Sequence, residues 1–210
     1  MSMQQEKRFS APVIALDIGN VSMKLNFDEM YRRFDIDPAD SESIGRLWEH
    51  GAALETGRIT VPEFLDRLYE FSGYRHTREY LLDAWRCGVR DPMPGMLETV
   101  RALAARGVRF SFMSDISSIH LDQVFKYCEF VHLVTGGIYS FEAGAFKLDG
   151  SAMFDAFECR YGRPLAFFDD RIEIIEHARG LGWNAIRFES PEQVLRDACA
   201  LLEEAKPPLR

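Results

Sequence analysis

The stretch VIALDIGN, residues 13–20, runs four apolar residues directly into Asp17 and then turns through Gly19 and Asn20. A short apolar run that ends in turn residues is typical of a buried strand. A carboxylate at the end of such a strand has two interpretations. It can cap a turn, or it can be a nucleophile or a metal ligand. The choice between them depends on what the other strands of the chain carry at their ends.

Strand-like and helix-like segments alternate after residue 89. The expected strands are 108–115, 130–137, 164–170 and 184–188, and the expected helices are 96–107, 117–128, 150–162, 171–182 and 190–205. This alternation is the signature of a parallel sheet with helices on both faces. The sequence therefore predicts an α/β fold.

Residues 26–86 show apolar side chains at helical spacing and no strand-like segment between them. Thr60 is followed two residues later by Pro62 and three residues later by Glu63. This is the pattern of a capping box at a helix start. We therefore predict a core domain over 1–22 and 89–210, interrupted by a helical cap domain over 23–88. Ligands of open α/β sheets bind at the carboxyl edge of the strands, above which this insertion would lie.

Polar residues stand at the ends of three expected strands: Asp17, then Ser114 and Asp115, then Asp169 and Asp170. In a parallel sheet these ends lie side by side, so the carboxylates would be crowded together. Like charges that close raise each other's pKa unless a cation neutralises them. Mg²⁺ is the natural choice, because it takes carboxylate and phosphate oxygens.

A phosphate ligand would also need hydrogen-bond donors and a positive charge at this edge. Ser114 offers a hydroxyl group, and the helix expected after it offers the positive end of its dipole. Lys147 lies in a long loop before the chain returns to the same edge. A lone lysine in a loop is most often an ordinary surface residue, but this position favours a functional one.

The composition restricts the classes of partner. The 210 residues carry a formal net charge of −8, which argues against a nucleic acid or an anionic membrane surface as partner. No apolar run approaches the roughly 20 residues of a membrane span. The N-terminus, MSMQQEKRFS, lacks the apolar stretch of a signal peptide, so a cytoplasmic location is expected. The four cysteines and five histidines show no metal-ligand spacing.

The order of these features resembles the haloacid dehalogenase-like (HAD) superfamily: an Asp strand, a helical insertion, a Ser strand, a loop Lys and a strand that ends in two acids. The insertion after the first motif resembles the C1-cap branch. DIGNV together with FFDD is similar to sugar-phosphate phosphatases of the α-D-glucose-1-phosphate phosphatase type. The resemblance implies a Rossmann-like parallel sheet of strand order 3-2-1-4-5 with an inserted all-helical cap.

The resemblance also implies roles for single residues. Asp17 would be the nucleophile that forms an aspartyl-phosphate. Ser114 would donate a hydrogen bond to the transferred phosphoryl group, and Lys147 would neutralise charge on the nucleophile and the phosphate. The Mg²⁺ ligands implied are Asp17, the backbone carbonyl of Gly19, and Asp170 with the assistance of Asp169.

Four positions depart from the family pattern. Gly19 stands where a second Asp usually acts as general acid and base, a loss that typically costs about 10²–10⁴-fold in rate. Asp115 replaces a common Asn; its side chain would repel phosphate, whereas its backbone N–H would bind it. Leu148 replaces a Pro after the lysine, so the loop is expected to be less rigid. Ile174 replaces an Asn or Asp, and Arg171 is available nearby to offset the acids.

Three functional hypotheses therefore remain open at this point. The first is a Mg²⁺-dependent phosphatase that hydrolyses a small phosphorylated metabolite through Asp17. The alternative is a degenerate HAD-like protein that binds a phosphorylated ligand or partner with little or no turnover. The third is a metal-independent dehalogenase of 2-haloacids, which the paired acids at 169 and 170 make the least consistent of the three.

Overall fold

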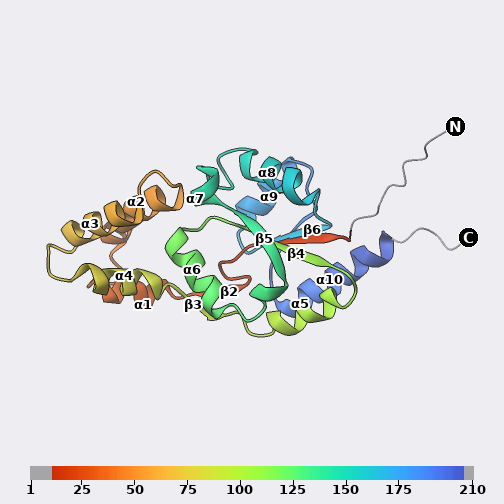
Figure 1. The fold of residues 1–210 in the computed structure, drawn as a ribbon, viewed down its shortest axis with the longest axis horizontal. Helices are drawn as coiled ribbons and strands as arrows, with labels where there is room; N and C mark the ends of the chain where they lie inside the picture. The colour runs from red at the N-terminus through yellow and green to blue at the C-terminus, as the bar shows by residue number, and fades with distance from the viewer. Residues whose placement is uncertain (1–10, 206–210) are drawn as a thin grey trace, which may run out of the picture.

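The computed structural model describes residues 11–205 of the chain. Within that range five parallel strands form one sheet in the order β5-β4-β1-β6-β7 (Figure 1). Their bounds are β1 Val13–Leu16, β4 Arg109–Ser114, β5 Val134–Tyr139, β6 Ala166–Asp169 and β7 Ala185–Arg187. If these five strands alone are numbered 1 to 5 as they occur in the chain, their order in the sheet is 3-2-1-4-5. This order confirms the predicted α/β topology. The prediction that the N-terminus is not a signal peptide concerns residues 1–10, which lie outside the described range.

The central strand β1 positions the carboxyl edge of the sheet. Leu16 is the register partner of Phe112 in β4 on one side and of Phe168 in β6 on the other. The N–H of Asp17 then donates to the carbonyl of Phe168 at 2.9 Å. Because the three strands run in parallel and end at the same level, the residues that end them become neighbours.

Helices cover both faces of this sheet, and alternate residues of β1 pack toward opposite sides. Ile14 and Leu16 belong to one apolar cluster, with side chains from α5, α6 and α10, whereas Val13 and Ala15 belong to a second, with side chains from α8 and α9. The bounds are α5 Met96–Ala104, α6 Ser118–Tyr127, α8 Ala152–Tyr161, α9 Ile172–Gly180 and α10 Pro191–Glu204. Burial on both faces explains why β1 is apolar throughout.

Four further helices pack against one another beside the sheet, and we call them the helical unit. They are α1 Phe27–Arg33, α2 Ser41–Glu55, α3 Val61–Phe71 and α4 Arg78–Arg86, coloured red-orange to olive at the left of Figure 1. Phe64, Leu68 and Trp85 are fully buried in a third apolar cluster that these helices share. The predicted capping box at Thr60 and Glu63 is present.

A two-stranded antiparallel ribbon, which the sequence did not predict, joins the helical unit to the rest of the chain. β2, Met23–Leu25, pairs with β3, Val89–Pro92. These strands are too short to give an alternating pattern that stands out from a loop. The chain leaves toward the helical unit and returns from it through this ribbon. The predicted domain limits at 22/23 and 88/89 fall beside it and stay a prediction.

The segment after α6 also differs from the expectation. A strand was expected over 130–137, but Val131–Leu133 forms a 3-10 turn and β5 runs over Val134–Tyr139. The glycines at 136 and 137 therefore lie inside the strand rather than at its end. A side chain at 137 would collide with the ring of Tyr139, which explains the small residue there. The short helix α7, Ser140–Ala143, follows directly and was expected to be loop.

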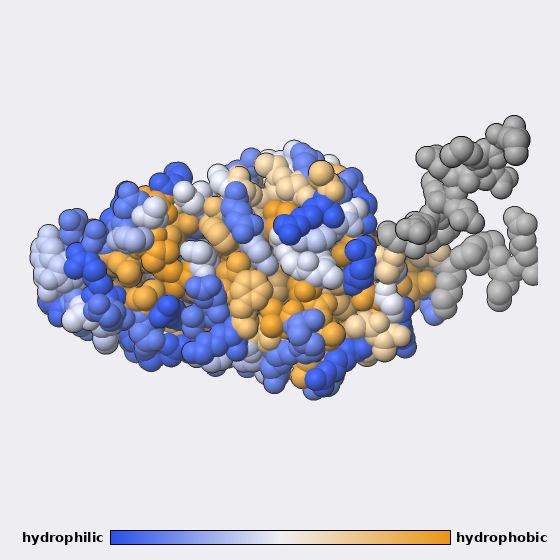
Figure 2. Space-filling model, in the orientation of Figure 1, coloured by the Kyte–Doolittle hydropathy of each residue, from blue (hydrophilic) through white to orange (hydrophobic). Residues whose placement is uncertain are grey.

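The surface of the helical unit is mostly polar, with apolar side chains visible between its upper and lower helices (Figure 2). Within the described residues, no helix has the length and apolar character needed to cross a membrane.

Candidate active site

A cavity of about 610 Å³ lies between the helical unit and the carboxyl edge of the sheet. Its walls include Trp48 and Glu55 from α2 on one side and Asp17, Ser114 and Asp170 at the strand ends on the other. This volume is within the usual range for pockets that enclose a small molecule. All of the charged site residues predicted from the sequence line it, except Asp169, which is fully buried beneath it.

Lys147 links two of the predicted acids. Its Nζ donates to Asp17 Oδ1 at 2.8 Å and to Asp169 Oδ2 at 2.5 Å. Only 2% of Lys147, 6% of Asp17 and 0% of Asp169 are exposed to solvent. A buried lysine on a loop is uncommon unless its charge is paired. The interpretation of Lys147 as an ordinary surface residue is therefore wrong.

The titration of this group of charges depends on the balance between burial and pairing. Burial raises the pKa of the Asp17 carboxyl to about 7; the Lys147 ammonium acts against that shift, and the Asp169 charge adds to it. Burial alone would lower the pKa of Lys147, but the surrounding carboxylates raise it above its ordinary value. The lysine therefore stays charged, and a cation bound beside Asp17 would lower the pKa of Asp17 and favour the carboxylate.

Ser114 is the last residue of β4 and Asp115 follows it, and the two have different surroundings. Ser114 is buried at the cavity, just before α6, whose N-terminus is capped by Ser117. The carboxylate of Asp115 accepts the backbone N–H of Lys147 at 2.8 Å. Asp149 Oδ2 likewise accepts the N–H of Phe146 at 2.9 Å. These two bonds connect the Lys147 loop to the end of β4 and close it on itself; the effect of Leu148 on its rigidity stays a prediction.

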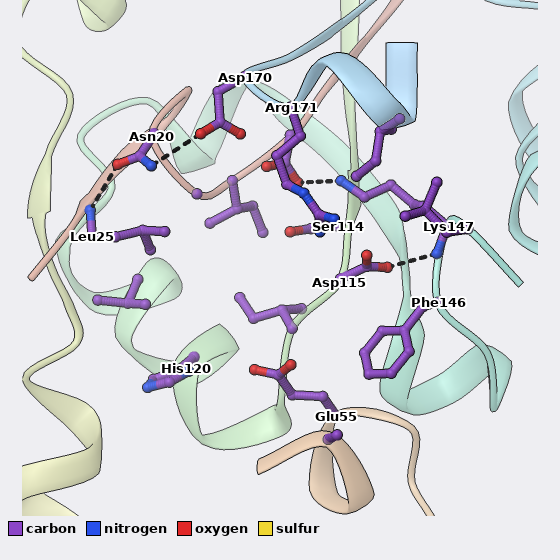
Figure 3. Close-up of a pocket in the computed structure, with 18 of the residues that line it drawn as sticks. Asn20, Leu25, Glu55, Ser114, Asp115, His120, Phe146, Lys147, Asp170 and Arg171 are labelled. Atoms are coloured by element: carbon purple, nitrogen blue, oxygen red, sulfur yellow. Dashed lines mark hydrogen bonds and ion pairs between the residues drawn. The ribbon is translucent and has the colours of Figure 1, made fainter. Parts of the chain in front are cut away.

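Asp17, Asp169 and Asp170 offer carboxylate oxygens that all lie within 4.8 Å of one another. Asp170 Oδ2 accepts a hydrogen bond from Asn20 Nδ2 at 3.0 Å, which orients it toward the turn after β1 (Figure 3). Gly19 lines the cavity in that turn. A set of hard oxygen donors at this spacing suits a divalent cation such as Mg²⁺. The residues present therefore fit the predicted metal.

Several residues that line the cavity were not singled out from the sequence. They include Leu25, Phe27, Glu55, His120 and Phe146. Glu55 is the last residue of α2, and nothing in the sequence distinguishes it from the other acids on helical faces. Within residues 11–205 its carboxylate has no hydrogen-bond or ion-pair partner, and Figure 3 shows it pointing into the cavity.

Comparison of the chain with protein-family models finds no match, and neither does comparison with curated protein sequences. Solved structures do match. A HAD family enzyme from Bacteroides thetaiotaomicron has a TM-score of 0.75 and 19% identity, over 86% of this chain and 95% of that one. Its wild-type complex with magnesium and inorganic phosphate has a TM-score of 0.73 and 19% identity, over 85% of this chain and 94% of that one.

Two other solved structures show how widely this architecture is shared. A predicted HAD-like family hydrolase from Porphyromonas gingivalis has a TM-score of 0.73 and 20% identity, over 92% of this chain and 98% of that one. A dehalogenase with an intermediate complex has a TM-score of 0.59 and 15% identity, over 86% of this chain and 85% of that one. Different reactions thus occur on one architecture. The chain has the fold of the HAD-family hydrolases.

Proposed function

We propose that the protein is a Mg²⁺-dependent phosphatase that hydrolyses a small phosphomonoester through an aspartyl-phosphate on Asp17. The observation that carries this proposal is the buried bridge from Lys147 to Asp17 and Asp169, with Asp170 beside it at the cavity. A nucleophilic carboxylate repels a phosphate dianion, so the site must supply positive charge at the point where the two meet. Lys147 supplies part of that charge.

Each residue has a defined task in this mechanism. An oxygen of Asp17 attacks phosphorus, and the Ser114 hydroxyl and the N–H groups at the start of α6 bind the phosphoryl oxygens. Lys147 counteracts the effect of burial on the pKa of Asp17 and orients the carboxylate through its 2.8 Å bond. Asp17, Asp170 and the Gly19 carbonyl would hold Mg²⁺, with Asp169 assisting. The bound cation supplies further neutralisation of the nucleophile and the phosphate.

Comparison with other HAD-like structures supports a phosphate-directed site rather than a halide-directed one. The structurally similar Bacteroides enzyme binds magnesium and inorganic phosphate. Three clustered carboxylates favour a metal-dependent reaction, whereas dehalogenation of a 2-haloacid needs no metal. The helical unit then acts as a cap of the C1 type over the leaving group. Sugar phosphates are the first substrate class to test, because the sequence motifs resemble phosphatases of that class.

A panel of small phosphomonoesters, assayed for phosphate release with Mg²⁺, tests this function. We expect turnover that stops with EDTA and falls by at least about 10³-fold in Asp17→Asn. Asp122→Asn, which changes an exposed carboxylate on α6, is the matched control and should keep full activity. Equal turnover in the wild type and Asp17→Asn would overturn the proposal. Binding of phosphorylated ligands without hydrolysis, even with enzyme in excess, would favour the non-catalytic alternative.

A further inference from the structure

We propose that Glu55 of the helical unit is the general acid and base of the reaction, in place of the side chain that Gly19 lacks. This inference rests on the proposed function and goes beyond it, because it assigns the proton transfer to a residue outside the sheet edge. Four observations carry it: the space at Gly19, the free carboxylate of Glu55, the contact that positions it, and the charges around it.

Gly19 has no side chain that could act as an acid, and a side chain at this position would crowd Leu25. A Cβ at this position would lie 3.2 Å from Cδ1 of Leu25, closer than most side-chain contacts. A longer side chain here would therefore require Leu25 of β2 to shift. A proton donor for the leaving group must enter the cavity from another element.

Glu55 stands apart from the other carboxyl groups of the cavity in having no partner. In the described part of the chain, the other carboxyl groups that line it each accept a hydrogen bond: Asp17 from Lys147, Asp115 from the N–H of Lys147, Asp149 from the N–H of Phe146, and Asp170 from Asn20. Glu55 accepts none, and its carboxyl group points into the space opposite Asp170 in Figure 3. A half-buried acid without a partner in the protein is available to a ligand.

A close contact between backbones fixes the end of α2 over the site. Gly57, two residues after Glu55, has a φ of +64°, and a Cβ there would collide with the carbonyl oxygen of Phe141 in α7. A residue other than glycine would be strained by both effects. Since α7 leads into the loop that carries Lys147, the same contact sets Glu55 relative to Lys147.

The charged and titratable groups around Glu55 favour its protonated form. Burial raises the pKa of Glu55 to about 8, and the Asp115 carboxylate at the end of β4 adds to that shift. The cations at the cavity do not pair with it: Lys147 bonds Asp17 and Asp169, and Arg171 forms no ion pair with it. Burial lowers the pKa of His120 in α6 to about 4, so that ring is neutral, and it bonds the carbonyl of Trp85 at 2.8 Å.

The proton balance of the reaction is complete with this assignment. As Asp17 attacks, the bond from phosphorus to the ester oxygen breaks, and that oxygen takes the electron pair and the proton of Glu55. The resulting Glu55 carboxylate then accepts a proton from water as the water oxygen attacks the aspartyl-phosphate. The bond from phosphorus to Asp17 breaks, Asp17 regains its electron pair, and Glu55 is protonated again. Water and the leaving group both stand opposite Asp17, so one residue serves both steps.

The decisive experiment varies the leaving group. We compare the wild type and Glu55→Gln on an alkyl phosphate taken from the substrate panel and on 2,4-dinitrophenyl phosphate, whose leaving group needs no proton. We expect kcat/KM for the alkyl ester to fall by about 10²–10⁴-fold, while the formation of the aspartyl-phosphate from the aryl ester changes by less than about fivefold. The fall of wild-type kcat/KM above pH 8 should be absent in Glu55→Gln.

Two controls keep the result interpretable. Glu49→Gln alters an exposed acid on the same helix and should match the wild type on both esters. Difference infrared spectroscopy of wild type against Glu55→Gln should show a protonated carboxyl band at pH 7 that disappears above pH 8.

Three outcomes would overturn the assignment: an equal loss on both esters, which identifies a binding residue; no loss on either; or an ionised Glu55 at pH 7. In each of them Asp17→Asn would still abolish turnover, so the proposed function would stand. If neither ester is hydrolysed by the wild type and no aspartyl-phosphate forms, the proposed function fails, and this inference fails with it.

Discussion

The two walls of the cavity differ in how their polar groups are satisfied. At the sheet edge Lys147, Asp17 and Asp169 bond one another, and Asn20 bonds Asp170. On the side of the helical unit, Glu55 has no partner within the described residues, and the other side chains from α1 and α2 there, Phe27, Trp48 and Ala52, are apolar or aromatic. The charged groups of the edge are thus organised before a ligand arrives, whereas the Glu55 carboxylate on the opposite wall is left for a ligand to contact.

Lys147→Ala tests the organised wall and should have the largest effect. The substitution leaves two buried carboxylates without their cation, and breaking a buried ion pair in this way typically costs about 3–5 kcal/mol of unfolding free energy. We also expect activity to fall by at least about 10²-fold, because a stabilising charge is lost. Urea denaturation and phosphate release measure the two effects.

The exposed Lys126 on α6 is the matched control, and Lys126→Ala should change neither quantity measurably. Saturating Mg²⁺ should recover part of the stability that Lys147→Ala loses, since the cation neutralises the same acids. If Lys147→Ala is as stable as the wild type without Mg²⁺, the sheet edge is not organised by this bridge.

Phe64→Ala and Phe157→Ala compare the two regions as folding units. Both side chains are fully buried, Phe64 in the cluster of the helical unit and Phe157 in a cluster beneath the sheet. Each change should cost about 3–5 kcal/mol, because it leaves a large cavity. We expect hydrogen exchange in Phe64→Ala to speed up mainly within 27–86, and in Phe157→Ala throughout the sheet and its helices.

This pair of variants also tests the predicted domain limits at 22/23 and 88/89. Faster exchange that ends at those limits would support a separate cap domain. Uniform acceleration along the whole chain in Phe64→Ala would mean that the helical unit and the sheet unfold as one. Phe125→Ala, at an exposed phenylalanine on α6, provides the baseline for both.

Thr60→Ala should have the smallest effect of the series. It removes a helix cap in which the Thr60 hydroxyl accepts the N–H of Glu63, while the Glu63 carboxylate accepts the N–H of Thr60. Losing such a cap costs about 1 kcal/mol. Thermal unfolding should show a slightly lower midpoint, with unchanged kcat on a small ester. A large fall in kcat would mean that α3 shapes the cavity, although Thr60 does not line it.

The sequence predicted which residues lie at the sheet edge because the same local pattern occurs at the end of each strand. The strands that lead to Asp17, Ser114 and Asp169 are mainly apolar and are followed by polar residues, and parallel pairing brings such ends together. The prediction for Lys147 needed one further piece of information, its place before the chain returns to that edge. The strand order followed from the resemblance to a known family.

The elements that the sequence missed are those that depend on contacts over long distances. β2 and β3 are short and stabilise each other across 60 or more residues of intervening chain, so neither shows a strand pattern alone. The predicted limits of β5 were wrong because the apolar residues at 130–134 favour a strand and the glycines at 136 and 137 favour its end, whereas β5 begins at Val134 and runs on to Tyr139. Glu55 has no local signature, since its surroundings come from packing between distant segments.

The contact of Gly57 with Phe141 has a practical consequence for redesign of this protein. This contact joins two main chains and does not depend on side-chain rotamers, so it can hold the end of α2 next to α7 when side chains that line the cavity are exchanged. Libraries aimed at new substrates can therefore diversify Phe27, Trp48 and Phe146 while residue 57 is kept as glycine. Such libraries would alter the shape of the cavity while the contact between Gly57 and Phe141 is kept.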